Sequence, residues 1–270
     1  MSRVQHATSG DGTRIGYVTS GTGHPLVMVP GATADHTALS RVVQLLESDY
    51  TVHAVDRRGR GLSGDSAQYD ISLEYADVAG VVDQVAARAG EAVVLYGHSY
   101  GAVCALGAAA MTRNLRSLIL YEPGFQGVVL TPDDVLDRLD ALVAAGAHDA
   151  ALEHAYRFGV GMSADEVAAM RAQPSWQARV ATATTVPREF RTAANLPLDA
   201  TAVAALPVPT VLLLGDRSTA GQKAVVRALH AALPSSDVVV LPDQAHAAQV
   251  TAPDLIANAL RGHRFVPASF

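Results

Sequence analysis

The segment Gly97-His98-Ser99-Tyr100-Gly101 is the part of this chain whose residue types point most directly to chemistry. It lies between an apolar run, residues 92–96, that predicts a strand and a small-residue run that predicts a helix. A serine in a sharp strand-to-helix turn has a strained backbone and an exposed hydroxyl, and flanking glycines avoid clashes in such a turn. The pattern therefore indicates a nucleophilic serine.

A serine hydroxyl is a weak nucleophile, so it needs a base nearby and an acid that orients the base. His246 is the candidate base, because it follows the predicted strand 238–241 and precedes the last predicted helix. That position is at the same sheet edge as Ser99, and a serine that precedes the histidine in the chain is typical of such pairs. The other histidines lack metal-ligand spacing with Cys, Asp or Glu, so no metal site is predicted.

Elements that could position these residues follow an alternating pattern. Apolar runs predict strands at residues 14–19, 26–29, 50–55, 92–96, 115–121, 210–214 and 238–241. Helical patterns separate them, for example the stripe of Val78, Val81, Val82 and Val85. Buried strands separated by amphipathic helices predict an α/β fold with a mostly parallel sheet that is covered on both faces.

The strand signal disappears between residues 123 and 205, where short helical patterns are interrupted by glycine and proline. We interpret the chain as an α/β core, residues 1–122 and 206–270, with a helical cap or lid, residues 123–205, inserted after the sixth strand. Such an insertion would cover the carboxyl edge of the sheet, where open α/β sheets bind their ligands.

Composition excludes several classes of function. The 270 residues include 20 Lys and Arg against 26 Asp and Glu, and the net charge of −6 gives no reason to expect nucleic acid as a partner. The single cysteine, Cys104, excludes an intramolecular disulfide and a cysteine-based zinc site. Neither a signal peptide nor an apolar run of the roughly 20 residues that cross a bilayer is apparent, so we expect a cytoplasmic protein with no membrane partner. The oligomeric state stays open.

Four segments together resemble the α/β-hydrolase fold superfamily over essentially the whole chain. They are Pro30-Gly31-Ala32, the run from Asp56 to Ser63, the Ser99 pentapeptide and the late His246. The resemblance implies an eight-stranded sheet, a nucleophile elbow at Ser99, and an oxyanion hole made by the backbone N–H groups of Ala32 and Tyr100. No cofactor is expected. The chain has Pro30-Gly31 where the family usually has His-Gly, so a side chain that normally braces this loop is missing.

The acid is the second departure from the family pattern. The family usually has it three residues beyond a glycine after the seventh strand, where this chain has Ser218. Glu122 and Asp216 are the available carboxylates. We favour Glu122, because it ends the strand beside that of Ser99 and has the longer side chain. This placement resembles zearalenone-type lactone hydrolases, while Asp216 remains the alternative.

These residues predict a serine hydrolase that cleaves a carboxylic ester or lactone of an apolar, medium-sized small molecule through an acyl-enzyme. Thioester and carbon–carbon bond cleavage stay open, as does a charged acyl group facing Arg188 or Arg191. The expected substrate contacts are His36, Phe125, Tyr156 and Trp176. Two other classes remain as alternatives: a lyase or tailoring enzyme that forms no acyl-enzyme, and a catalytically silent ligand-binding protein.

Overall fold

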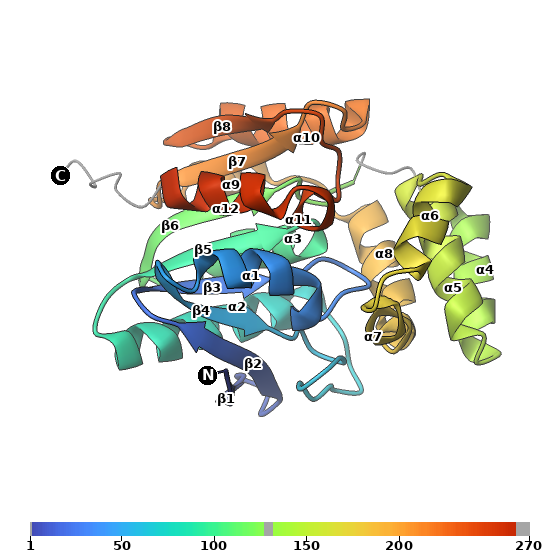
Figure 1. Cartoon of the computed structure of the whole chain (residues 1–270), viewed down its shortest axis with the longest axis horizontal. Coiled ribbons are helices and arrows are strands. Elements are labelled where there is room, and N and C mark those ends of the chain that lie inside the picture. The colour runs from blue at the N-terminus through green and yellow to red at the C-terminus, as the bar shows by residue number, and fades with distance from the viewer. Residues whose placement is uncertain (1, 127–131, 263–270) are drawn as a thin grey trace.

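A computed structural model describes residues 2–126 and 132–262 (Figure 1). The strands are β1 (Arg3–Thr8), β2 (Arg14–Gly21), β3 (His24–Val29), β4 (Tyr50–Val55), β5 (Val93–His98), β6 (Leu115–Tyr121), β7 (Thr210–Gly215) and β8 (Ser236–Leu241). They form one eight-stranded sheet in the order β1-β2-β4-β3-β5-β6-β7-β8. Only β2 runs against its neighbours, β1 and β4, and the other described pairings are parallel. The predicted mostly parallel sheet is confirmed.

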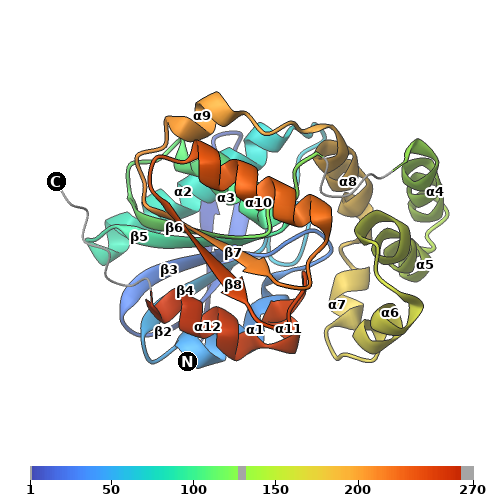
Figure 2. The same ribbon diagram turned by 90° about the horizontal axis from the view of Figure 1, so that it is seen from above.

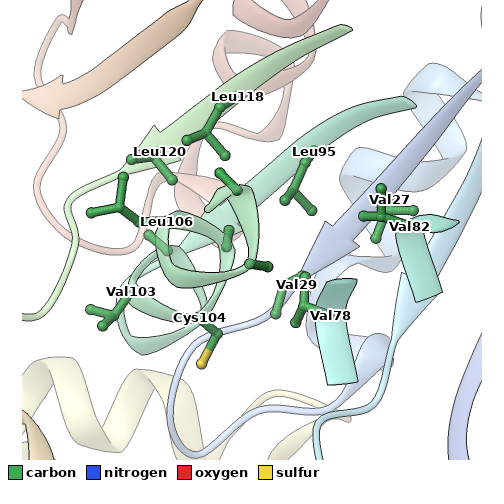
Figure 3. Packing of buried hydrophobic residues seen from close by; sticks show 14 of the residues in the cluster. Val27, Val29, Val78, Val82, Leu95, Val103, Cys104, Leu106, Leu118 and Leu120 are labelled. Carbon is green, nitrogen blue, oxygen red and sulfur yellow. The ribbon is translucent and has the colours of Figure 1, made fainter. Parts of the chain in front are cut away.

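Helices cover both faces of this sheet (Figure 2). One face carries α1 (Ser40–Leu46), α11 (Ala248–Thr251) and α12 (Pro253–Gly262), and the other carries α2 (Ile71–Ala89), α3 (Tyr100–Ala109) and α10 (Ala220–Ala232). The core between the sheet and the second set joins Val27 and Leu95 of the strands to Val78 and Val82 of α2 (Figure 3). Burial of these apolar faces fixes the carboxyl ends of the central strands, from which the candidate site is built.

The chain between β6 and β7 forms further helices. These are α4 (Asp133–Ala144), α5 (His148–His154) with a π-helical continuation (Ala155–Val160), α6 (Ala164–Arg171), α7 (Trp176–Val180), a short 3₁₀ turn (Ala183–Thr185), α8 (Val186–Asn195) and α9 (Ala200–Ala204). Helices α4 to α8 gather beyond one end of the sheet (Figures 1 and 2). We call residues 123–205 the inserted segment, of which 127–131 lie outside the described residues. Within the described ranges, no helix is long and apolar enough to cross a membrane.

The sequence patterns do not predict several elements, among them β1 and α8. Strand β1 has no periodic apolar pattern in the sequence, because Ala7 is its one buried residue. Helix α8 was missed because Pro187 suggested an interruption. The proline lies instead in the first turn of α8, where a missing N–H costs no helical hydrogen bond.

Candidate active site

Ser99 lies alone between β5 and α3 with φ 55° and ψ −121°, a conformation that side-chain-bearing residues rarely adopt. Its neighbours must be small. A Cβ on Gly97 would lie 2.5 Å from the carbonyl oxygen of Gly101, and a Cβ on Gly101 would lie 2.3 Å from that of Pro30. The two glycines thus let strand, turn and helix pack closely while the Ser99 hydroxyl faces the cavity described below.

The two predicted oxyanion donors lie at this turn and in the loop after β3. Tyr100 is the first residue of α3, where backbone N–H groups have no partner inside the helix. Ala32 lies in the loop after β3, next to Thr33, whose φ of 60° turns the chain. Among the residues that the structure describes, neither amide donates a hydrogen bond to another residue. Both remain available for a ligand oxygen.

Arginine side chains hold this loop after β3. Arg57 donates hydrogen bonds to the carbonyl oxygens of Pro30 and Gly31, both at 3.1 Å. Arg60 donates to the carbonyl of Ala34 at 3.1 Å. The brace lost with the usual His-Gly pair is thus replaced from the turn after β4. This turn is structural and presents no basic surface patch, because both arginines are buried.

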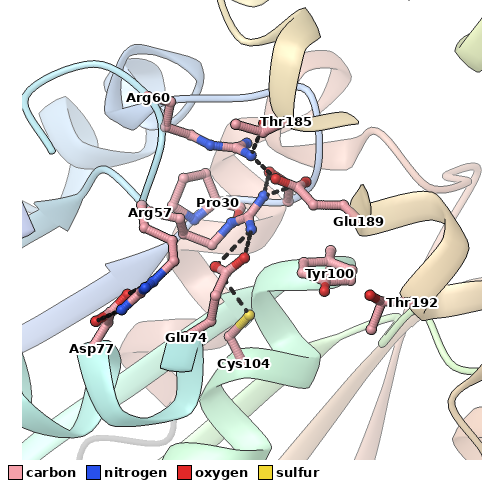
Figure 4. Close-up of polar contacts among 12 residues, drawn as sticks. Pro30, Arg57, Arg60, Glu74, Asp77, Tyr100, Cys104, Thr185, Glu189 and Thr192 are labelled. Carbon is pink, nitrogen blue, oxygen red and sulfur yellow. Dashed lines mark hydrogen bonds and ion pairs between the residues drawn. The ribbon is translucent and has the colours of Figure 1, made fainter. Parts of the chain in front are cut away.

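The arginines are neutralised by two buried carboxylates (Figure 4). Glu74 of α2 accepts hydrogen bonds from Arg57 at 2.8 and 2.9 Å. Glu189 of α8 forms an ion pair with Arg57 at 2.8 Å and another with Arg60. Glu189 belongs to the inserted segment, so this segment is tied to the core by buried charge as well as by packing.

Glu122 and His246 form the central polar contact of the site. Glu122 directly follows β6 with a positive φ of 44°, and it is fully buried. Its Oε2 lies 2.7 Å from Nδ1 of His246. Its Oε1 accepts the N–H of Gly215 at 2.8 Å and also the hydroxyl of Ser218. With Nδ1 engaged, His246 has Nε2 left to act as a base.

The alternative acid lies elsewhere. Asp216 is exposed, and the contact that it offers Lys223 is its backbone carbonyl, 2.6 Å from Nζ. Ser218, which occupies the usual acid position, instead donates its hydroxyl to Glu122. The structure therefore brings Glu122 to His246 and leaves Asp216 at the surface.

Neighbouring side chains fix the loop that carries His246. The Tyr121 hydroxyl donates to the carbonyl of Ala245 and accepts the N–H of Ala248 at 3.2 Å. Burial holds the pKa of His98 well below its usual range, so its ring is neutral. Its Nε2 lies 2.9 Å from the carbonyl oxygen of His246 and donates to it. These contacts tie the loop on both sides of His246 to the ends of β5 and β6.

A cavity of about 320 Å³ opens between the carboxyl edge of the sheet and the inserted segment. Ser99, His246, Ala32 and Tyr100 all line it. The expected substrate contacts Phe125 and Tyr156 line it as well, and further apolar side chains come from the inserted segment: Val160, Met162, Met170 and Phe190. The proposed nucleophile, base and oxyanion donors thus line one cavity.

Two expected substrate contacts, His36 and Trp176, are not among the residues that line this cavity. His36 Nδ1 lies 2.8 Å from the Asp56 carboxylate, and this hydrogen bond raises the pKa of His36. Trp176 packs against Tyr156 and donates its indole N–H to Asp149 at 2.6 Å. Each side chain is held by a partner that the sequence does not reveal.

The cations singled out from the sequence also face other partners. Arg188 pairs with Asp65 at 2.9 Å, and Arg191 pairs with Asp137 at 3.0 Å. Arg179, which sequence reasoning missed, lines the cavity instead. No sequence signal separates these three arginines, since the choice depends on how the inserted helices pack.

Comparisons with known proteins agree with this arrangement. The model of the alpha/beta hydrolase family matches residues 26–259, so the chain belongs to this family. An alpha/beta hydrolase structure from Sphaerobacter thermophilus is 33% identical, with a TM-score of 0.83 over 95% of this chain and 98% of that one. An esterase from Rhodococcus sp. is 23% identical, with a TM-score of 0.73 over 96% and 97% of the two chains.

One curated relative matches only part of the chain. N-formylmaleamate deformylase of Pseudomonas putida is 34% identical over 121 residues, which are 44% of this chain and 45% of the deformylase. The match thus spans less than half the length of that relative.

Proposed function

We propose that this protein hydrolyses a carboxylic ester or lactone of a small molecule, with Ser99 as nucleophile, His246 as base and Glu122 as acid. The observation that carries the proposal is the 2.7 Å contact between Glu122 and Nδ1 of His246 beside the strained Ser99 turn. The lining of the 320 Å³ cavity supports a largely apolar substrate of modest size, with Phe125 and Tyr156 in contact with it. We further propose that α4 to α8 act as a cap that shapes this cavity.

The proposed reaction has two halves. The Ser99 hydroxyl attacks the carbonyl carbon while His246 Nε2 takes its proton, and the resulting oxyanion accepts hydrogen bonds from the amides of Ala32 and Tyr100. The protonated His246 then gives its proton to the leaving alcohol, which leaves an acyl group on Ser99. In the second half, a water molecule gives a proton to His246 and attacks the acyl carbon. His246 then returns the proton to Ser99 as the carboxylic acid is released. Glu122 stabilises the charge that His246 acquires in both halves.

Cleavage of an amide C–N bond is the second candidate. The observation that favours it is the partial match to N-formylmaleamate deformylase. The same residues would serve, except that His246 would protonate a leaving nitrogen. Matched ester and amide substrates with one acyl group separate the two candidates by their kcat/KM values.

The test is covalent labelling of Ser99 with a fluorophosphonate, read by intact mass and peptide mapping. We expect rapid labelling of the wild type at Ser99, and labelling lost in Ser99→Ala and slowed by about 10⁴-fold or more in His246→Ala. Ser48→Ala, on the far side of the protein from the turn, serves as the matched control and should label normally. An unlabelled wild type would contradict the proposal and favour a silent ligand-binding protein. Turnover without an acyl-enzyme would favour a lyase or tailoring enzyme.

A further inference from the structure

Arg179 places a buried positive charge on the wall of the cavity. It belongs to α7 in the inserted segment and is only 7% exposed. Its Nη1 donates to the hydroxyl of Tyr156 at 3.1 Å and to the carbonyl oxygen of Thr33 at 3.4 Å. Both acceptors are uncharged, so the guanidinium keeps its full charge next to the space where a substrate would lie.

Other arginines in comparable positions have carboxylate partners. Arg57 and Arg60 are buried and share Glu189, and Arg217, an exposed residue of the cavity lining, pairs with Asp243. In the part of the chain that the structure describes, Arg179 has no such partner. A buried charge without a counter-charge is costly, and proteins retain one chiefly where a ligand supplies the opposite charge.

The contacts of Arg179 also indicate where a bound anion would lie. Thr33 directly follows Ala32, a proposed oxyanion donor, and its hydroxyl lies 2.7 Å from that of Tyr156. Arg179 thus touches the loop that would hold the acyl carbonyl. An anion bound to Arg179 would belong to the acyl part of a substrate, a short chain away from the reacting carbon.

We propose that Arg179 binds a carboxylate on the acyl group, which makes the substrate a half-ester of a short dicarboxylic acid. This inference rests on the hydrolytic function proposed above. A single carboxylate balances the positive charge of Arg179, and the fork of a guanidinium matches its two oxygens. A doubly charged phosphate would leave one negative charge uncompensated by Arg179, and the cavity lining also includes the acidic residue Glu166.

The kinetic test compares monoethyl succinate with ethyl levulinate, in which a methyl ketone replaces the carboxylate. The wild type should prefer the charged ester. Arg179→Gln should raise KM for monoethyl succinate by about 10-fold to 100-fold, the range expected for a hydrogen-bonded charge, and leave ethyl levulinate nearly unchanged. Arg179→Lys should restore part of the preference, because it keeps the charge and loses the fork.

The matched control is Arg191→Gln, which removes an arginine of the same segment that pairs with Asp137 and Asp140 outside the cavity lining. It should change neither KM. Equal use of both esters by the wild type, or an equal loss with both in Arg179→Gln, would overturn the carboxylate proposal while leaving the hydrolytic function intact.

A binding measurement separates the two proposals. Calorimetry of monoethyl succinate with Ser99→Ala should give a Kd about 10-fold to 100-fold tighter than with Ser99→Ala/Arg179→Gln. If that difference is found but the wild type cleaves neither ester, the proposed hydrolysis fails and the carboxylate site stands. Absence of a difference would reject the carboxylate site. Tighter binding of the corresponding phosphonate ester would reject the choice of a carboxylate.

Discussion

The two oxygens of Glu122 have different partners, which matters for how the residue acts. One oxygen faces His246, while the other accepts hydrogen bonds from Gly215 and Ser218. A carboxylate whose two oxygens both accept hydrogen bonds has a fixed orientation. It therefore orients the imidazole ring of His246 and also stabilises the positive charge of that ring.

The first prediction concerns this charge. Glu122→Gln keeps the shape of the side chain and removes its charge, so kcat should fall by about 10³-fold to 10⁴-fold with little change in KM. Asp216→Asn is the control and should cost little. Steady-state kinetics with one activated ester measures kcat and KM for both variants. A severe defect in Asp216→Asn beside a nearly normal Glu122→Gln would assign the acid to the loop after β7.

The second prediction concerns Ser218 as a positioning residue. Ser218→Ala removes one of the two donors to Oε1 of Glu122, so kcat should fall by about tenfold while KM is retained. Ser218→Thr keeps a hydroxyl and should recover most of the rate. An unchanged kcat in Ser218→Ala would mean that the backbone N–H of Gly215 orients Glu122 sufficiently.

Some of these residues could be predicted from the sequence, and others could not. Ser99, Glu122 and His246 each end or follow a strand with a clear apolar pattern, so their common location at one sheet edge could be predicted. The lining role of Arg179 depends on side-chain packing in the inserted segment, for which the sequence has no comparable signal. The same limit applies to His36 and Trp176, which are not among the lining residues.

At the scale of elements, helix α8 connects the inserted segment to the loop after β3. Glu189 reaches Arg57 and Arg60, and these two arginines hold three carbonyl oxygens of that loop. Periodic patterns predict helices and strands, but Glu189 and Arg57 are 132 positions apart, and no local pattern pairs them. The arginine-rich turn could therefore be predicted as structural without its partner in α8.

The third prediction tests this cluster. Glu189→Gln leaves Arg60 without its counter-charge and Arg57 with only Glu74, so the free energy of unfolding should fall by about 3–5 kcal/mol. Urea denaturation followed by circular dichroism measures it. Glu153→Gln breaks a half-exposed pair with Arg171 in the same segment and should cost no more than about 1 kcal/mol. A similarly small loss in Glu189→Gln would contradict the importance of the buried cluster.

At the scale of the whole molecule, the buried His53 should reduce stability in acid. His53 of β4 contacts Thr19 of β2 at 2.9 Å, and burial lowers its pKa from 6.5 to about 4. Between these pH values the unfolded chain binds a proton that folded His53 does not. The contribution of neutral His53 is therefore complete above pH 6.5 and is lost as the pH falls towards about 4.

The fourth prediction follows from this loss of stability as the pH falls. The Tm of the wild type should decline more steeply from pH 6.5 to 4 than that of His53→Gln, which has no proton to gain at this position. Thermal scans of both proteins across this range provide the measurement. Parallel declines would show that other groups determine the acid sensitivity.

The chain leaves the core immediately after Glu122 and returns to it before β7, so the residues proposed for the reaction all precede or follow the inserted segment. Insertions, deletions and substitutions within α4 to α8 would leave their order and their supporting strands unaltered. Natural variation can therefore change which molecules enter the cavity without rebuilding the reaction machinery. Glu189 limits this freedom, since a variant of the segment that lacks its carboxylate must supply another. A library for new substrate ranges would accordingly diversify the cavity-facing positions of these helices and keep position 189 constant.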